Sequence, residues 1–324
     1  MGGLSLYRGV TGLAVVLALT VVVLGAYVRL SAAGLGCPDW PGCYGYLSAA
    51  QAEAHAGQIA TRFPEQPLQA DKAAKEMLHR YVAGTLGLLV LAVAVLAWRS
   101  GRGRTLPLLL VGLIVFQALL GMWTVTLLLK PLVVTAHLLG GMAVLALLWW
   151  LWLDSRAPPT GMRWMPLRPL AVIGLLLVAG QILLGGWTSA HYAGLACSGF
   201  PTCNGQWWPA GDYAAALGAK PMDAAGLVAI QWLHRLGALV VVLIPGALAL
   251  NCVRRGAVVG RIGWLLGLLL LLQVALGIGN VLTGLPLMLA AAHNAVAALL
   301  LLTLVSLNHP RIRGADRTLI GDIP

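Results

Sequence analysis

Four histidines in apolar surroundings are the residues of this chain best placed to do chemistry. Two of them belong to a short sequence that occurs twice, Glu-Met-Leu-His-Arg at 76–80 and Gln-Trp-Leu-His-Arg at 231–235. A second histidine follows each copy, within an apolar run. The corresponding histidines of the two copies are offset by 155 and 156 positions, and the pairs are His79 with His137 and His234 with His293. Two imidazoles on facing helices are what bis-imidazole ligation of a haem iron requires. The pattern therefore predicts two haem sites, one in each half.

Two other interpretations of the histidines are weaker. A single intramembrane histidine could be a polar contact between helices. Four that are paired and repeated favour a function, because ionisable residues at membrane depth are costly. Zinc or copper is the second alternative, but such sites generally need more close ligands than one histidine pair supplies.

The residues around each first histidine differ between the halves at one position. Glu76 and Gln231 are equivalent, and each lies three residues before its histidine, on the same helical face. Only the first half therefore places a titratable group beside its histidine pair. We infer that the N-terminal half does chemistry and that the C-terminal half holds a redox or structural cofactor. The alternative is that Glu76 is a solvated residue at the entrance of its span.

An arginine follows each first histidine, at Arg80 and Arg235. A haem carries two propionates, and a guanidinium at the membrane interface could pair with one of them. An arginine at the end of a span can equally extend its side chain toward water without binding a ligand. The sequence leaves both interpretations open.

The cysteines form two pairs with five residues between the members, Cys37/Cys43 and Cys197/Cys203. Both lie in loops that we place outside the cytoplasm, a compartment that permits disulfides. Structural disulfides are favoured for Cys197/Cys203. A thiol–disulfide couple that cycles is an equal alternative for Cys37/Cys43. Cys252 is expected to be a free thiol, and the loop and helix-end histidines are expected not to be ligands, namely His55, His191 and His309.

The elements that must position these residues are membrane spans. The chain has 324 residues, of which 60% are hydrophobic and 10% charged, and its mean hydropathy is +0.87. These values predict an all-α polytopic membrane protein. We expect eight transmembrane helices at 8–30, 77–98, 106–129, 131–153, 168–190, 226–250, 260–283 and 286–308.

Orientation follows from the basic residues. Of the 21 lysines and arginines, 13 fall at the termini and between spans two and three, four and five, and six and seven. The positive-inside rule assigns this side, with both termini, to the cytoplasm. The cysteine loops then lie on the extracytoplasmic side of the membrane, which we expect to be the cell membrane of a prokaryote. The net charge of +11 therefore mainly reflects the orientation of the spans in the membrane. Because the basic residues are dispersed among short loops, no nucleic-acid partner is expected.

The whole chain reads as an internal repeat. The loop at 33–45 aligns with 193–205, and Gln-Ala-Leu-Leu-Gly at 117–121 aligns with Gln-Val-Ala-Leu-Gly at 273–277. The first span therefore has an internal counterpart and is not read as a cleaved signal peptide. Four spans per half predict two four-helix bundles related by a pseudo-twofold axis along the membrane normal. The expected domains are residues 1–155 and 156–324.

In this combination the chain resembles the haem A synthase family, membrane enzymes that convert haem O to haem A for cytochrome oxidases. The resemblance covers nearly the full length and rests on the eight repeated spans, the four histidines, Glu76 before His79, and the two cysteine pairs. It implies that His79 and His137 bind the substrate haem and that Glu76 is the catalytic acid. It further implies a haem b held by the second pair, His234 and His293.

The same resemblance implies oxidation of a porphyrin methyl group to a formyl group, by two successive hydroxylations and loss of water from a gem-diol. The implied partners are the haem O synthase, cytochrome oxidase assembly factors, the lipid bilayer and an electron donor that the sequence does not identify. A homo-oligomer is compatible with it.

Three alternatives explain less of the sequence. A dihaem b-type electron carrier usually places its haems at different depths, whereas these four histidines share one side. A parallel-repeat transporter predicts broken helices with polar residues at the midplane. A membrane thiol oxidoreductase would explain the cysteines but not the histidines.

Overall fold

The computed structural model describes residues 2–156, 169–218, 220–254 and 257–310. The described residues form helices and loops without a β-strand, and eight of the helices are long and apolar enough to cross a membrane. The expected all-α membrane architecture is confirmed. The eight helices are α1 (Gly2–Leu30), α4 (Ala70–Arg99), α5 (Thr105–Thr126), α6 (Pro131–Ser155), α7 (Pro169–Ala190), α9 (Ala224–Val253), α10 (Ala257–Leu282) and α11 (Leu287–Asn308).

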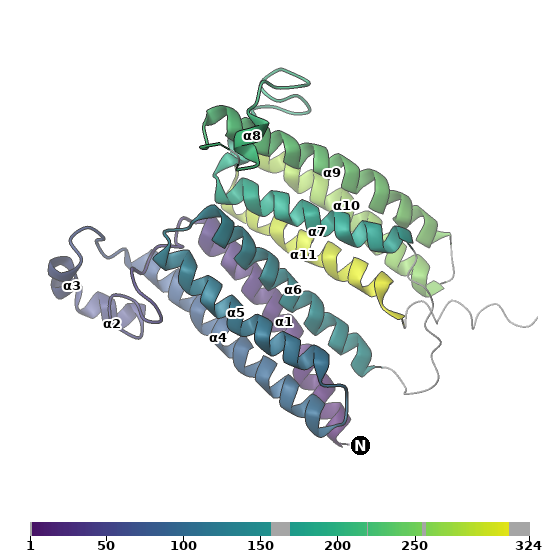
Figure 1. Cartoon of the computed structure of the whole chain (residues 1–324), viewed down its shortest axis with the longest axis horizontal. Coiled ribbons are helices and arrows are strands. Elements are labelled where there is room, and N and C mark those ends of the chain that lie inside the picture. Colours follow the sequence, from purple (N-terminus) through teal and green to yellow (C-terminus); the bar gives the residue numbers. More distant parts are fainter. Residues whose placement is uncertain (1, 157–168, 219, 255–256, 311–324) are drawn as a thin grey trace, which may run out of the picture. The chain divides into compact units, whose positions relative to one another are not determined.

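Contacts group the chain into two compact units, residues 1–148 and 149–324. In the first unit α4 packs against α1 and α5. Helix α6 joins them, because a side chain placed at Gly140 would meet Gln117 of α5 and one placed at Gly141 would meet Val22 of α1. Figure 1 shows these four helices running side by side.

In the second unit, helices α7, α9, α10 and α11 form a closed ring in which each packs against its two neighbours (Figure 1). Both units therefore follow one plan, a bundle of four membrane-length helices. The pseudo-twofold axis and the orientation in the membrane remain predictions from the sequence.

Several helix boundaries differ from the expected spans, and α1 already begins at Gly2, six residues before the expected span at 8–30. Helix α4 begins at Ala70, seven residues before the expected span at 77–98. Helix α5 ends at Thr126, whereas its span was expected to reach 129. The physical reason for the early end is that Leu128 and Leu129 have φ of 51° and 57°, which a right-handed helix cannot contain.

The loops that follow α1 and α7 share one conformation. Each contains a disulfide, Cys37–Cys43 in the first unit and Cys197–Cys203 in the second. After each second cysteine, two successive residues have positive φ, 55° and 81° at Tyr44-Gly45 and 52° and 79° at Asn204-Gly205. Such a pair is typical of a tight hairpin turn, and glycine at its second position adopts that conformation without strain.

Each of these loops is accompanied by short helical segments. In the first unit they are α2 (Ala49–Ala54) and α3 (Ala56–Arg62), and α2 contacts α4. The hydroxyl of Ser48 caps α2 by accepting the backbone N–H of Gln51. In the second unit they are the single turn η1 (Ala193–Leu195) and α8 (Tyr213–Ala216), which contacts α9.

Candidate functional site

The four histidines lie on alternate helices of the two bundles, at matching positions. His79 lies nine residues after the start of α4, and His234 lies ten residues after the start of α9. His137 and His293 each lie six residues after the start of α6 and α11. His79 was expected in the first turn of its helix. It lies deeper in the helix because α4 begins seven residues earlier than expected.

The surroundings of the imidazoles provide few polar partners. The Nδ1 atoms of His79, His137 and His293 are buried and have no hydrogen-bond partner within the described residues. The Nδ1 of His234 lies 3.0 Å from the Nε2 of Gln181. The two members of each pair come from one unit, His79 and His137 from the first and His234 and His293 from the second.

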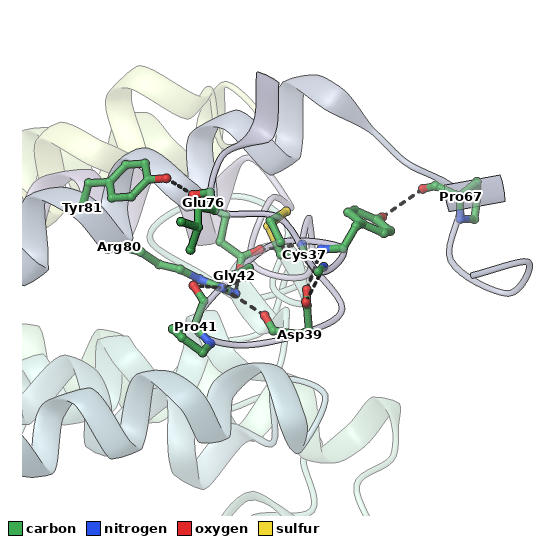
Figure 2. The surroundings of a disulfide bond; sticks show 12 residues. Cys37, Asp39, Pro41, Gly42, Pro67, Glu76, Arg80 and Tyr81 are labelled. Carbon is green, nitrogen blue, oxygen red and sulfur yellow. Dashed lines mark hydrogen bonds and ion pairs between the residues drawn. A yellow bond between two sulfur atoms is a disulfide. The ribbon is translucent and has the colours of Figure 1, made fainter. Parts of the chain in front are cut away.

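The Glu76 side chain is buried and points toward the first disulfide loop (Figure 2). One of its oxygens accepts the backbone N–H of Cys37 at 3.0 Å, and the other accepts Nη2 of Arg80 at 2.5 Å. Glu76 is 4% exposed, so the alternative of a solvated residue at the span entrance is wrong. The guanidinium of Arg80 and the backbone N–H of Cys37 thus each hold one carboxylate oxygen. These bonds fix the carboxylate one helical turn before His79 on α4.

The Arg80 guanidinium also binds the loop rather than extending into water (Figure 2). Its Nη1 donates to the backbone carbonyls of Asp39 at 3.0 Å, Pro41 at 3.2 Å and Gly42 at 2.5 Å. With Glu76 it forms an ion pair whose side chains are only 13% and 6% exposed. Arg80 therefore ties the start of the disulfide loop to α4.

The second unit repeats this arrangement with a neutral side chain. The carbonyl oxygen of Gln231 accepts the backbone N–H of Cys197, and its amide donates to the carbonyl of Gly194 at 2.6 Å. Arg235 donates to the carbonyls of Thr202 at 2.9 Å and Cys197 at 3.0 Å. The equivalence of Glu76 and Gln231 expected from the sequence is thus reproduced in space, and the carboxylate is the feature that distinguishes the first unit.

Asp39 is a loop residue whose role the sequence reasoning missed. Its two carboxylate oxygens accept the backbone N–H groups of Tyr44 at 2.6 Å and Gly45 at 2.7 Å, which closes the turn after Cys43. An acidic residue shortly before an X-Gly turn is a local signal that could have identified it. In the second loop the side chain of Asn204 closes the turn instead, by accepting the backbone N–H of Ser198 at 2.8 Å.

Tyr44 reports the electrostatics of this region. Burial raises the pKa of the Tyr44 hydroxyl, and the negative charges of Glu76 and Asp39 raise it further. The hydroxyl donates to the carbonyl of Pro67 at 3.3 Å. The loop side of the first unit is therefore an environment that resists additional negative charge.

The remaining histidines and cysteine lie apart from these sites. His55 Nδ1 bonds the carbonyl of Gln51 at 2.8 Å, and His191 Nδ1 bonds the carbonyl of Trp187 at 3.0 Å. His309 lies 3.0 Å from the carboxylate of Asp154. Cys252 is buried and forms no disulfide.

The arrangement fits a haem in each unit. The imidazoles of each pair come from two helices of one bundle, and the Nδ1 atoms of His79, His137 and His293 have no hydrogen-bond partner in the part of the chain that the structure describes. Each ring also lies against a glycine of a neighbouring helix, where any side chain would take up space. In the second unit the Nε2 of Gln273 lies 3.2 Å from the Nε2 of His293 and would have to release that nitrogen to an iron.

Comparison with known proteins places these features in a family. The model of the COX15-CtaA family, described as cytochrome oxidase assembly protein, matches residues 8–305. A protein of Shewanella oneidensis named Heme A synthase is 43% identical over 310 residues, covering 91% of this chain and 93% of that protein. Proteins of the same name from Rhizorhabdus wittichii and Halalkalibacterium halodurans are each 29% identical, over 92% and 88% of this chain and 91% and 90% of their own lengths.

Proposed function

The chain belongs to the COX15-CtaA family of cytochrome oxidase assembly proteins, and we propose that it is a haem A synthase, a multi-pass membrane enzyme that oxidises a methyl group of haem O to the formyl group of haem A. The observation that carries the proposal is the buried Glu76 carboxylate one helical turn from His79, in the one half of the repeat where that position is acidic. The full-length similarity to relatives named Heme A synthase supports the same activity.

In this proposal the first unit binds the substrate. His79 and His137 would hold the iron of haem O and so orient the porphyrin within an apolar bundle. The assignment is supported by the position of both imidazoles on two helices of one bundle, with Nδ1 atoms that have no hydrogen-bond partner among the described residues.

Glu76 is the group that handles protons in the first unit. Conversion of a methyl group to a formyl group takes up one oxygen atom, from water or dioxygen, and passes electrons to an external acceptor. The protons that leave as the C–H bonds break can be accepted by a carboxylate near the methyl. Arg80 and the backbone N–H of Cys37 hold the two oxygens of Glu76 in place, so the carboxylate is preorganised rather than free to rotate. Gln231 holds the second loop in the same way but cannot exchange a proton.

The second unit is proposed to hold a haem b on His234 and His293. When bound, this group supplies one-electron redox chemistry. The chain's own contribution is to hold the two imidazoles, and the amides of Gln181 and Gln273 lie against them. With such a group held there, the second unit would carry electrons, and the first unit would hold the substrate.

The setting follows from the same assignments. The proposed partners are the haem O synthase and cytochrome oxidase assembly factors, because the matching family is described as cytochrome oxidase assembly protein. The positive-inside rule places both disulfide loops on the extracytoplasmic side of the cell membrane. The histidines then lie toward that side in both units, near the loops that Glu76 and Gln231 tie down.

The proposal is tested by purifying the full chain from a host that makes haem O, extracting the pigments in acid, and separating them chromatographically beside a pyridine haemochrome spectrum. Haem b together with haem O, a hydroxylated intermediate or haem A is the expected result. Haem b alone at two per chain would favour a dihaem electron carrier. A well-folded preparation without haem would overturn the proposal.

A further inference from the structure

Each of the four histidines faces a glycine on a helix that carries no member of the two pairs. A Cβ atom built on each glycine would fall close to Cε1 of the opposite imidazole. The pairs and their distances are Gly25 of α1 with His79 at 2.9 Å, Gly121 of α5 with His137 at 3.5 Å, Gly185 of α7 with His234 at 3.2 Å, and Gly277 of α10 with His293 at 3.1 Å.

These contacts show that the imidazoles use space that a side chain would fill. At three of the four positions, the distance is shorter than an ordinary van der Waals contact of a Cβ atom, so alanine would push the ring or its helix away. Small residues let helices and their side chains approach closely within a membrane. Gly9 of α1, Gly112 of α5 and Gly180 of α7 meet nothing within 4 Å, whereas on α10 Gly263 and Gly279 are also in close contact, with α9 and with Leu289 of α11. On α1, α5 and α7 these open glycines therefore serve as controls for the histidine-facing ones.

A glutamine lies four residues before three of these glycines, at Gln117, Gln181 and Gln273. This spacing places each amide on the same helical face as its glycine, one turn away. The Nε2 of Gln181 lies 3.0 Å from Nδ1 of His234 and donates to that residue's backbone carbonyl at 2.9 Å. The Nε2 of Gln273 lies 3.2 Å from a ring nitrogen of His293.

The glutamine is replaced at one of the four sites. Val21 occupies the equivalent position before Gly25, and the Nδ1 of the facing histidine, His79, has no hydrogen-bond partner within the described residues. In the first bundle the amide of Gln117 lies against Gly140 on α6, three residues after His137. His79 is therefore the one imidazole whose flanking helix offers no amide.

We propose that these Gln-x-x-x-Gly segments are positioning elements for the axial histidines. The glycine admits the imidazole edge against the helix backbone and so sets the direction of the ring. At Gln181 the amide also restrains the imidazole, through Nδ1 and the backbone carbonyl of His234. The inference rests on the proposed haem ligation. In it, helices α1, α5, α7 and α10, which carry none of the four histidines, orient the histidines of α4, α6, α9 and α11. Groups that orient a metal ligand typically change metal affinity or activity about 10–100-fold when removed.

The test compares two alanine substitutions on one helix of the full-length protein, Gly185→Ala at the histidine and Gly180→Ala as the matched control. The readouts are haem b per chain by pyridine haemochrome, the low-spin EPR g-values and the midpoint potential. We expect Gly185→Ala to lower haem b affinity about tenfold or more and to shift the EPR signal. Gly180→Ala is expected to match the wild type in all three.

Further variants keep the inference testable if Gly185→Ala fails to fold, namely Gln181→Leu and alanine at the other three histidine-facing glycines, Gly25, Gly121 and Gly277. Gln181→Leu conserves volume and removes the amide, and we expect it to shift the midpoint potential of haem b while haem content is retained. Gly121→Ala, at the longest of the four distances, is expected to perturb the substrate site less than Gly25→Ala. The matched controls for these two glycines are Gly112→Ala and Gly9→Ala.

The outcomes separate this inference from the function on which it rests. Wild-type haem content, g-values and potential in Gly185→Ala, Gly277→Ala and Gln181→Leu would overturn the inference while leaving the proposed function intact. Lower thermal stability with unchanged g-values of the retained haem would overturn it too, because it would show a purely structural role. A wild-type protein that binds no haem would overturn the proposed function and the inference with it.

Discussion

The backbone N–H of Cys37 donates to the carboxylate of Glu76 over 3.0 Å, which joins the first disulfide loop directly to the helix that carries His79. The same carboxylate accepts Arg80, and Arg80 in turn holds three carbonyls of the loop. One buried acidic side chain thus has both a structural partner in the loop and a position one turn from a proposed haem ligand. Substitutions can separate these two roles.

Glu76→Gln is expected to keep the loop in place and to stop the oxidation. Gln231 shows that an amide can accept the N–H of the cysteine at this position, so the fold is preserved. Loss of a group that transfers protons typically lowers a rate about 10²–10⁴-fold. We therefore expect haem binding close to wild type with haem A formation reduced by at least about 100-fold, measured by chromatography of extracted haems. Glu53→Gln, at an exposed site on α2, is the control, and a full haem A yield from Glu76→Gln would exclude the catalytic role.

Arg80→Leu is expected to destabilise the first unit strongly. It leaves the Glu76 carboxylate buried without its cation, and breaking one partner of a buried pair costs about 3–5 kcal/mol. Thermal unfolding of the detergent-solubilised protein measures this loss. The double substitution Arg80→Leu/Glu76→Gln removes the unpaired charge and should recover a large part of the stability. Equal unfolding temperatures for the single and double variants would show that the loop carbonyls, rather than the ion pair, account for the loss.

Replacement of each disulfide by two serines measures what the cysteines do. Both pairs are fully buried and close loops with a sequence separation of six residues, for which loop-closure entropy gives about 2 kcal/mol of stabilisation. We expect both double variants to unfold at lower temperature and to keep activity below that temperature. If Cys37→Ser/Cys43→Ser loses haem A formation without losing stability, the first pair is a cycling redox couple instead.

Alkaline pH is expected to destabilise the first disulfide loop through Tyr44. The pKa of Tyr44 is raised in the folded protein above its ordinary value of 10.0, so the folded state holds the proton more tightly than the unfolded state. Stability from this residue is complete below pH 10 and falls as pH rises from there through the folded pKa. Tyr44→Phe should reduce the loss of stability with rising pH above pH 10. Thermal unfolding measured at a series of pH values between 8 and 11 tests this. An unchanged slope would assign the alkaline loss to other groups.

The sequence alone was sufficient for the large-scale architecture. Spans of about 20 apolar residues can form only helices in a bilayer, because every backbone polar group must be satisfied within the segment. The eight spans, the paired cysteines and the equivalence of Glu76 with Gln231 could therefore be predicted from composition, spacing and repetition. Errors arose at helix ends, as at Leu128 and Leu129, where a local change in φ ends a helix within an apolar run.

The tertiary structure decided what the polar side chains contact. No spacing rule could reveal that Arg80 binds the carbonyls of a loop some 40 residues away, that Asp39 closes the turn after Cys43, or that each imidazole lies against a glycine of another helix. Helical periodicity predicts which face a residue occupies, but it does not predict the rotation and approach of one helix relative to the next. Those are set by packing, and packing is what brings Gly25 to His79 and Glu76 to Cys37.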